Sequence, residues 1–204
     1  MTYLMTHSLL SSWLYSMRDN PFADATQEDS SKEEFLRVLR REPTPTTDAM
    51  ANGIAFENLV TDIVHGVKVD QMAQWVGAAM KIANVVAGGQ LQFVATKRCT
   101  VGGLDLLLYG RLDALKAGEV YDIKFSKSYD RGKYVESTQH PMYLELVPDA
   151  ECFTYLISDG NEVWTEKYRR DETPSILPII NDFLAWLNIT GNIDTYKEYW
   201  RARE

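Results

Sequence analysis

The chain has 204 residues, of which 45% are hydrophobic and 25% charged, a composition that suits one globular domain with a sizeable core. No apolar run in it approaches the roughly 18–20 residues that span a membrane. The formal net charge of −8 argues against a surface that binds nucleic acid as a whole, although a local basic groove is compatible with it.

Cysteine and histidine usage limits the cofactors and the compartment. The two cysteines, Cys99 and Cys152, cannot by themselves form a four-cysteine zinc or iron–sulfur site, and the three histidines lack the spacing of a zinc enzyme. Their number does not indicate a disulfide framework, and the N-terminus lacks a basic leader and a cleavage site. We therefore expect a protein of the reducing cytoplasm.

The first half of the chain is predicted to be mainly helical. Helical spacing of apolar residues, N-cap candidates and glycine stops carry this prediction, and the polar residues 19–31 are expected to form a loop. The expected helices are residues 8–18, 32–42, about 47–65 (N-cap Thr46 or Thr47, stop at Gly66) and about 69–87.

After residue 89 the pattern changes to short segments rich in β-forming residues and bounded by turns. The expected strands are 90–101, 104–115, 119–126, 151–158 and 162–169. The expected helices are one that follows a basic loop at 126–133 and ends near residue 147, and two more at 174–188 and 193–203. This order predicts a single α/β domain with a helical part (1–89), a sheet with one helix (90–170) and C-terminal helices (171–204).

The hairpin of residues 104–126 brings charged residues together. Alternate residues of a strand share a face, so Asp122 and Lys124 should point to the same side. A turn centred on residues 117–118 would place Asp113 directly opposite Asp122 and Arg111 opposite Lys124, on one face.

This pairing predicts a site for a cation and an anion. Two opposed carboxylates repel each other, and Mg²⁺ relieves such a pair because it takes hard oxygen ligands, often carboxylates together with phosphate oxygens. The opposed cations Arg111 and Lys124 would be relieved by a phosphate. The alternative is a solvated outer face of the hairpin, where charges need no ligand.

Four motifs resemble those of a known family, and they occur along the chain in that family's order. The sequence GRLD at 110–113 followed by DIK at 122–124 resembles the core signature of PD-(D/E)XK nucleases. The segment GIAFE at 53–57 resembles their upstream helix motif. The segment QHPMY at 139–143 resembles the QxxxY motif of the branch with the RecB nuclease domain, CRISPR-associated exonucleases and phage exonucleases, and 8–13 is similar to that branch's first helix.

The resemblance implies a restriction-endonuclease-like core, a mixed central sheet flanked by helices, and a role for each matching residue. Asp113, Asp122 and the Ile123 carbonyl would bind Mg²⁺ or Mn²⁺. Glu57, where the branch usually has His and where phage lambda exonuclease is similar in having Glu, would complete the metal's shell or support a second metal. Lys124 would orient or deprotonate the attacking water.

The remaining implied contacts involve α-helical and loop residues. Gln139 and Tyr143 lie four residues apart and share a helical face, which the resemblance turns toward Lys124 or the DNA backbone. Pro141 between them predicts a kink or a helix that starts nearby. No cysteines match those that hold an iron–sulfur cluster in some members.

Basic and hydroxyl side chains after the third strand are candidates for DNA contacts, with a solvated loop as the alternative. Tyr129 could also stack on a base. The candidates are Arg111, Ser126, Lys127, Tyr129, Arg131 and Lys133, with Lys97 and Arg98 as further ones. For Lys167, Arg169 and Arg170 a surface role in solubility is favoured.

The expected function is a Mg²⁺-dependent exonuclease that degrades linear DNA during recombination or repair in a phage-infected or bacterial cell. One alternative is a structure-specific or restriction-like endonuclease with the same chemistry. Another is a non-catalytic DNA-binding or protein-interaction module that kept the fold. Expected partners are DNA, further copies of the chain and a single-strand annealing recombinase, and no membrane.

Overall fold

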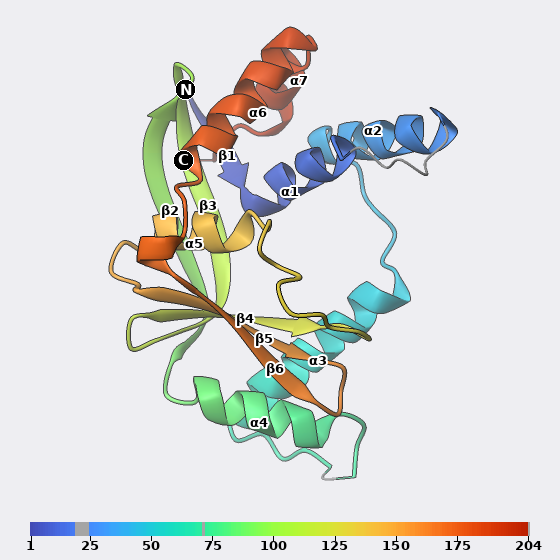
Figure 1. The fold of residues 1–204 in the computed structure, drawn as a ribbon, viewed down its shortest axis with the longest axis vertical. Helices are drawn as coiled ribbons and strands as arrows, with labels where there is room; N and C mark the ends of the chain where they lie inside the picture. Colours follow the sequence, from blue (N-terminus) through green and yellow to red (C-terminus); the bar gives the residue numbers. More distant parts are fainter. Residues whose placement is uncertain (19–24, 71, 204) are drawn as a thin grey trace.

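The computed structural model describes residues 1–18, 25–70 and 72–203, which form a mixed six-stranded sheet with helices on both faces (Figure 1). This confirms the expected α/β class. In chain order the elements are β1 (Thr2–Thr6), α1 (His7–Ser16), α2 (Ala25–Leu39), α3 (Asp48–Val64), α4 (Val76–Val86), β2 (Gln90–Val101), β3 (Leu104–Lys116), β4 (Glu119–Phe125), α5 (Gln139–Leu146), β5 (Cys152–Ser158), β6 (Val163–Arg169), the 3₁₀ turn η1 (Arg170–Glu172), α6 (Leu177–Ile189) and α7 (Ile193–Tyr199).

The long strand β3 organises the sheet. β2 runs antiparallel along one of its edges. β1 pairs in parallel with the first half of β3 as far as Tyr109, and β4 pairs antiparallel with its end from Ala114 onward. Because these β3 residues also pair with β2, β1 and β4 must lie on the same opposite edge. Residues 110–113 therefore lie at an opening between two strands of the sheet, which β5 and β6 extend beyond β4.

The five expected strands agree with β2 to β6 within one residue at every end. The strand β1 was not expected, because five residues give only two inward positions. Tyr3 and Met5 fill those positions and are buried. Residues 2–6 therefore form a strand within the part of the chain that was expected to be mostly helical.

The helices match less closely than the strands. Thr47 caps α3 by accepting a hydrogen bond from the Met50 amide (3.3 Å), as expected, and Gly66 follows the helix with φ +71°. α2 begins at Ala25, inside the expected loop 19–31, of which 19–24 lie outside the described residues. α4 and α5 begin at Val76 and Gln139, later than expected.

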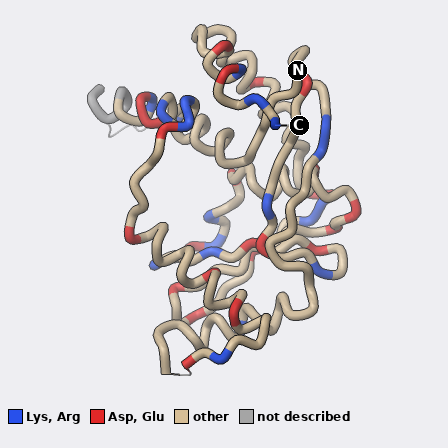
Figure 2. Tube along the Cα trace, turned by 180° about the vertical axis from the view of Figure 1, so that it is seen from behind, with Lys and Arg blue, Asp and Glu red and all other residues tan. Residues whose placement is uncertain are grey.

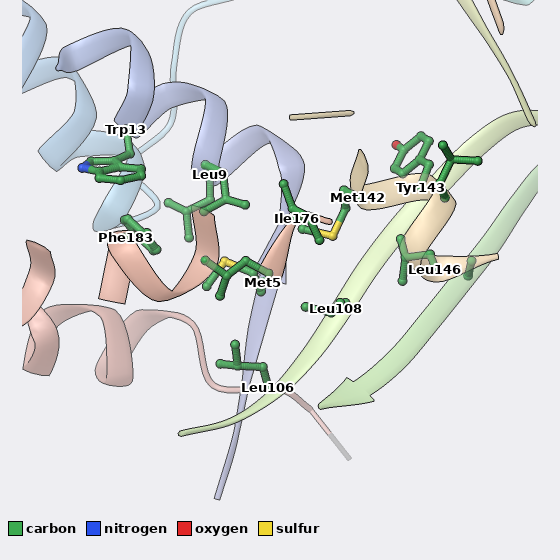
Figure 3. Packing of buried hydrophobic residues seen from close by; sticks show 14 of the residues in the cluster. Met5, Leu9, Trp13, Leu106, Leu108, Met142, Tyr143, Leu146, Ile176 and Phe183 are labelled. Atoms are coloured by element: carbon green, nitrogen blue, oxygen red, sulfur yellow. The ribbon is translucent and has the colours of Figure 1, made fainter. Parts of the chain in front are cut away.

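Hydrophobic cores lie on both faces of the sheet. On one face α5 packs against β3, α1 packs against α5 and α6, and α6 reaches β2, in a core that includes Leu9, Met142 and Phe183 (Figure 3). On the other face α3 packs against β4, and α4 packs against α3, β3 and β6, with Phe56 and Ile82 fully buried. α3 and α5 therefore approach the opening beside β3 from opposite sides.

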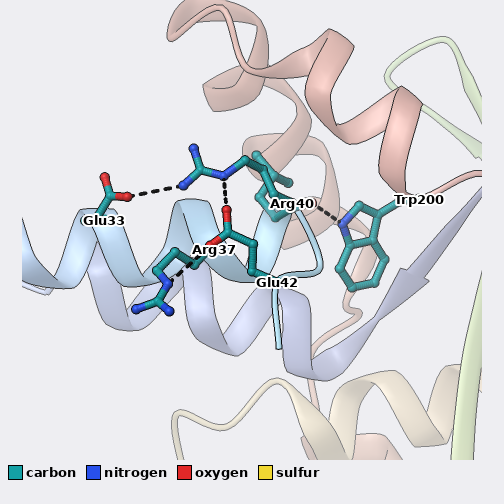
Figure 4. Close-up of polar contacts among 6 residues, drawn as sticks. Glu33, Arg37, Arg40, Glu42 and Trp200 are labelled. Atoms are coloured by element: carbon teal, nitrogen blue, oxygen red, sulfur yellow. Dashed lines mark hydrogen bonds and ion pairs between the residues drawn. The ribbon is translucent and has the colours of Figure 1, made fainter. Parts of the chain in front are cut away.

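The end of α2 is joined to the C-terminus (Figure 4). The indole Nε1 of Trp200 donates to the carbonyl of Leu39 (2.8 Å), and the Arg41 guanidinium lies over the Trp200 ring. The Trp200 carbonyl accepts from the Leu4 amide (2.6 Å), which places both chain ends beside β1. The nearby Arg40–Glu42 pair (2.6 Å) is exposed, and such pairs stabilise a fold by only about 0–1 kcal/mol.

Charges of both signs are interspersed along the chain, as Figure 2 shows for α2 and for the middle of the sheet. Among the described residues, no helix is long and apolar enough to cross a membrane. Cys99 and Cys152 are free cysteines.

Candidate active site

Asp122 and Lys124 meet on one face of β4. The distance from Lys124 Nζ to Asp122 Oδ2 is 2.8 Å, while Ile123 between them packs into the core under α3 and α4. The expected alternation of this strand is thus confirmed. Asp122 is only 4% exposed, so its charge lies in a poorly solvated environment with Lys124 as counter-ion.

The predicted register is confirmed for three pairs and then ends. The three pairs run from Ala114 with Tyr121 to Lys116 with Glu119. Beyond these pairs the strands separate, and Asp113 Oδ2 accepts a hydrogen bond from the Ile123 amide (2.7 Å). The prediction that Asp113 is directly opposite Asp122 is therefore wrong.

The expected Arg111–Lys124 pair is also absent from the described β3–β4 ladder, for the same reason. The Asp113 carboxylate, and not a main-chain carbonyl, is the partner of the Ile123 amide. The two aspartates therefore do not stand face to face. The separation also opens the sheet at the level of Asp113.

Asp113 lies in a strongly negative environment. Burial raises its pKa well above the usual value, and the carboxylates of Asp122 and Glu57 raise it further, against the opposing effects of the Ile123 amide and Lys124. The same groups act on Lys124, where burial would lower the pKa but Asp122 and Asp113 outweigh it and raise it. The carboxylates of Asp122 and Asp113 thus interact with the Lys124 ammonium, and Glu57 adds its negative charge at Asp113.

α5 brings Gln139 to the second oxygen of Asp122. The Gln139 amide Nε2 donates a hydrogen bond to Asp122 Oδ1, and the Tyr143 hydroxyl, one turn later, donates to the Arg111 carbonyl (3.0 Å). Pro141 is the third residue of α5, where its missing N–H has no helical partner, so the helix starts nearby and is not kinked. Both residues of the predicted helical face thus contact β3 or β4.

Glu57 reaches the site from α3. Its Oε1 accepts a hydrogen bond from Nε2 of Gln92 on β2 (2.7 Å). The helix packs against β4 through Phe56 and Val60, which fixes the direction of the next side chain. Gln92 was not recognised in the sequence, because a polar residue in an edge strand carries no signal of its own.

Among the candidate DNA-binding residues of the loop after β4, some are hydrogen-bonded within the fold and others are exposed. Lys133 donates to Ser126 Oγ (2.8 Å), and Tyr129 donates to Glu166 (2.6 Å) while packing against Trp164. These three side chains are thus engaged within the fold. Of the remaining candidates, Lys127, Arg131 and Arg111 are exposed.

The other basic candidates have structural partners. Lys97 pairs with Glu145 (2.6 Å) and Lys167 with Glu119 (2.8 Å). Arg170 donates to three main-chain carbonyls at and after the end of α5, which supports that helix and is more than a surface role in solubility. The partners of the last three are Thr2 for Arg98, Asp171 for Arg169, and the carbonyls of Leu144, Val147 and Ala150 for Arg170.

His7 is a neighbour of the site that sequence reasoning missed. Its ring lies edge-on to Tyr143 (5.4 Å between centroids), and its main-chain carbonyl accepts from Thr138, directly before Gln139. Burial, and then the charge of Lys124, lower its pKa to about 4. It is therefore neutral at pH 7, and a lone histidine in the sequence gave no sign of this position.

A divalent cation at this site would need several converging oxygen ligands. In residues 1–18, 25–70 and 72–203 no three His, Cys, Asp or Glu side chains converge closely enough to hold a metal by themselves. Asp122 Oδ2 is nevertheless buried, with the Lys124 ammonium at 2.8 Å as its counter-charge. Mg²⁺ commonly uses one or two carboxylates and completes its shell with water and phosphate oxygens, so Asp113 and Asp122 fit it chemically.

His140 makes stability depend on pH. It is 3% exposed and stacked on Tyr168, and burial lowers its pKa from 6.5 to about 4, while Glu166 opposes the shift. Between these values the unfolded chain binds the proton more readily than the folded chain, so stability is lost as pH falls from 6.5 toward 4. We expect His140→Phe, which retains a stacking ring, to remove about 1–2 kcal/mol of the stability lost between pH 7 and pH 5.

Urea unfolding of the wild type and His140→Phe at both pH values measures this difference. Asp113, whose pKa is raised, contributes in the opposite direction, and His7 in the same direction as His140, but both are present in the two proteins. Equal losses of unfolding free energy in the wild type and the variant would contradict the prediction.

Comparison with known proteins adds information on the fold. Neither a protein-family model nor a curated protein matches the chain. A solved structure described as the crystal structure of SSO0001 is similar to it, with a TM-score of 0.54 and 14% sequence identity, over 93% of this chain and 77% of the other. At this identity the likeness shows a shared fold alone.

Proposed function

We propose that the chain is a metal-dependent deoxyribonuclease of the PD-(D/E)XK superfamily with a restriction-endonuclease-like core. The observation that carries the proposal is the arrangement around Asp122. This buried carboxylate contacts Lys124 and Gln139 beside Asp113, at the place where β3 and β4 separate. A fold rarely retains several interacting carboxylates in one buried place without a positive ligand for them.

Four groups are proposed as the metal-binding set. Asp113, Asp122 and the Ile123 carbonyl would hold Mg²⁺ or Mn²⁺, and Glu57 would complete the shell or support a second ion. When bound, the cation would supply Lewis-acid stabilisation of the phosphate and a more acidic water. No iron–sulfur cluster is included in the proposal.

The side chains around the metal set have distinct proposed roles. Lys124 would orient the attacking water and stabilise charge that develops on the phosphate, because its ammonium group already lies on the face of Asp122. Gln139 would hold Asp122 in one orientation through its hydrogen bond. Tyr143 would hold α5 against β3 by its bond to the Arg111 carbonyl.

The proposed substrate is linear DNA, degraded from its ends in recombination or repair. The exposed cations Arg111 on β3 and Lys127 and Arg131 on the loop after β4 would contact phosphates, which suits a chain with a net charge of −8 whose DNA-binding surface is local. Lys133 and Ser126 would shape the loop that carries two of these cations, and Tyr129 would anchor it.

A cleavage assay with two DNA forms tests the proposal. We expect the purified chain to degrade end-labelled linear duplex in Mg²⁺ or Mn²⁺, to spare a closed circle, and to stop in EDTA. Nicking or linearisation of the circle would keep the nuclease and replace exonuclease with endonuclease. Absence of cleavage of both forms in both metals would remove the catalytic proposal and leave a binding or interaction module.

A further inference from the structure

Gln92 has an unusual backbone for a residue in the middle of a strand. Its φ is +52°, a conformation that side chains other than Gly, Asn and Asp rarely adopt. The neighbouring ladder pairs are Leu91 with Ala114 and Phe93 with Leu112, with one residue on each strand between them. The distortion is therefore not a bulge with an added residue, and it occurs opposite Asp113.

The ladders on both sides of β3 are thus disturbed at the same level. On one side Asp113 leaves the β4 ladder and accepts from the Ile123 amide. On the other side Gln92 turns into the left-handed region, and its amide donates to Glu57 Oε1 (2.7 Å) on α3. The unusual backbone conformation of Gln92 therefore occurs together with its hydrogen bond to Glu57, which lies on α3.

We infer that Gln92 is a positioning residue, whose distorted backbone aims its amide at Glu57 and holds this carboxylate toward Asp113. The inference rests on the proposed metal-binding function. One oxygen of Glu57 is engaged by Gln92 and the other is left for a cation. Backbone strain of this kind persists where the surrounding structure enforces it and is concentrated at functional sites. Groups that orient a metal ligand change metal affinity about 10–100-fold when they are removed.

Mn²⁺ binding to the full chain tests the inference without relying on catalysis. We expect Gln92→Leu to weaken Mn²⁺ binding about 10–100-fold, as measured by electron paramagnetic resonance titration. Gln92→Asn is the second variant, because Asn tolerates positive φ but is one methylene too short to reach Glu57. It should melt no lower than the wild type and still bind Mn²⁺ more weakly. Gln90→Leu, an exposed position on the same strand, should bind Mn²⁺ as the wild type does.

The outcomes separate the inference from the proposed function. If the wild type binds Mn²⁺ and both Gln92 variants bind it equally well, Gln92 has no positioning role and the nuclease proposal stands. If the wild type binds no Mn²⁺, the metal-binding proposal fails and the inference falls with it. Weakened binding in Gln92→Leu with unchanged binding in a well-folded Gln92→Asn would assign the effect to structural damage and overturn the inference.

Discussion

Replacement of Lys124 by alanine is expected to lower the rate of DNA cleavage by a factor on the order of 10²–10³, the usual loss when one preorganised charge is removed from a reaction site. The ammonium lies 2.8 Å from Asp122 Oδ2, and the strand alternation points both side chains to the same face. The measurement is single-turnover cleavage of end-labelled linear duplex in Mg²⁺. Lys81→Ala, an exposed position on α4 away from this face, is the matched control and should cleave at the wild-type rate.

The same substitution also removes the counter-ion of a buried carboxylate. Breaking a fully buried pair costs about 3–5 kcal/mol, and we expect about 2 kcal/mol here because the Lys124 side chain is 31% exposed. Urea unfolding in EDTA measures this loss. Lys124→Arg should retain the ion pair and most of the stability but remain slow in cleavage, since the planar guanidinium cannot reproduce a compact ammonium. Full activity of Lys124→Ala, or equal slowing in Lys81→Ala, would refute the proposed role.

The sheet was predicted from the sequence more accurately than the helices around it. The strands β2 to β6 combine β-forming residues with unambiguous stops, such as the Gly102–Gly103 turn, whose glycines both have positive φ. β1 has only two inward residues and depends on parallel pairing with β3, a contact 103 residues away along the chain that local pattern does not encode. Polar residues 25–31 form a helix in the fold although their composition is that of a loop.

The parts of the site that follow from the two-residue period of a strand could be predicted from the sequence. The parts that depend on a break in regular strand geometry could not. A period of two places Asp122 and Lys124 on one face, and the structure agrees. The same rule applied across the hairpin put Asp113 opposite Asp122, and failed because the strands separate there. His7 and Gln92 are brought in by tertiary structure, from a helix start and from a strand with a distorted backbone, and neither departure leaves a mark in the local sequence.

Replacement of Gly110 by alanine is expected to destabilise the fold by about 1–3 kcal/mol, as overpacking of a core does. A Cβ at this position of β3 would lie 2.5 Å from Cε1 of Tyr143 and 2.8 Å from Cδ1 of Leu146. Tyr143 is 4% exposed and its hydroxyl is bonded to the Arg111 carbonyl, so the ring cannot swing aside alone. α5 would have to move away from β3, and urea unfolding at pH 7 measures the loss.

Movement of α5 should also affect the cleavage rate, because this helix holds Gln139 against Asp122. We therefore expect Gly110→Ala to cleave DNA more slowly under conditions in which it is still fully folded, and Gly110→Ala with Tyr143→Leu to recover stability by removing the clashing ring. Gly77→Ala, on α4 with no atom near the added carbon, should be as stable as the wild type or more so. Wild-type stability and cleavage in Gly110→Ala would mean that α5 does not need its close contact with β3 to position Gln139.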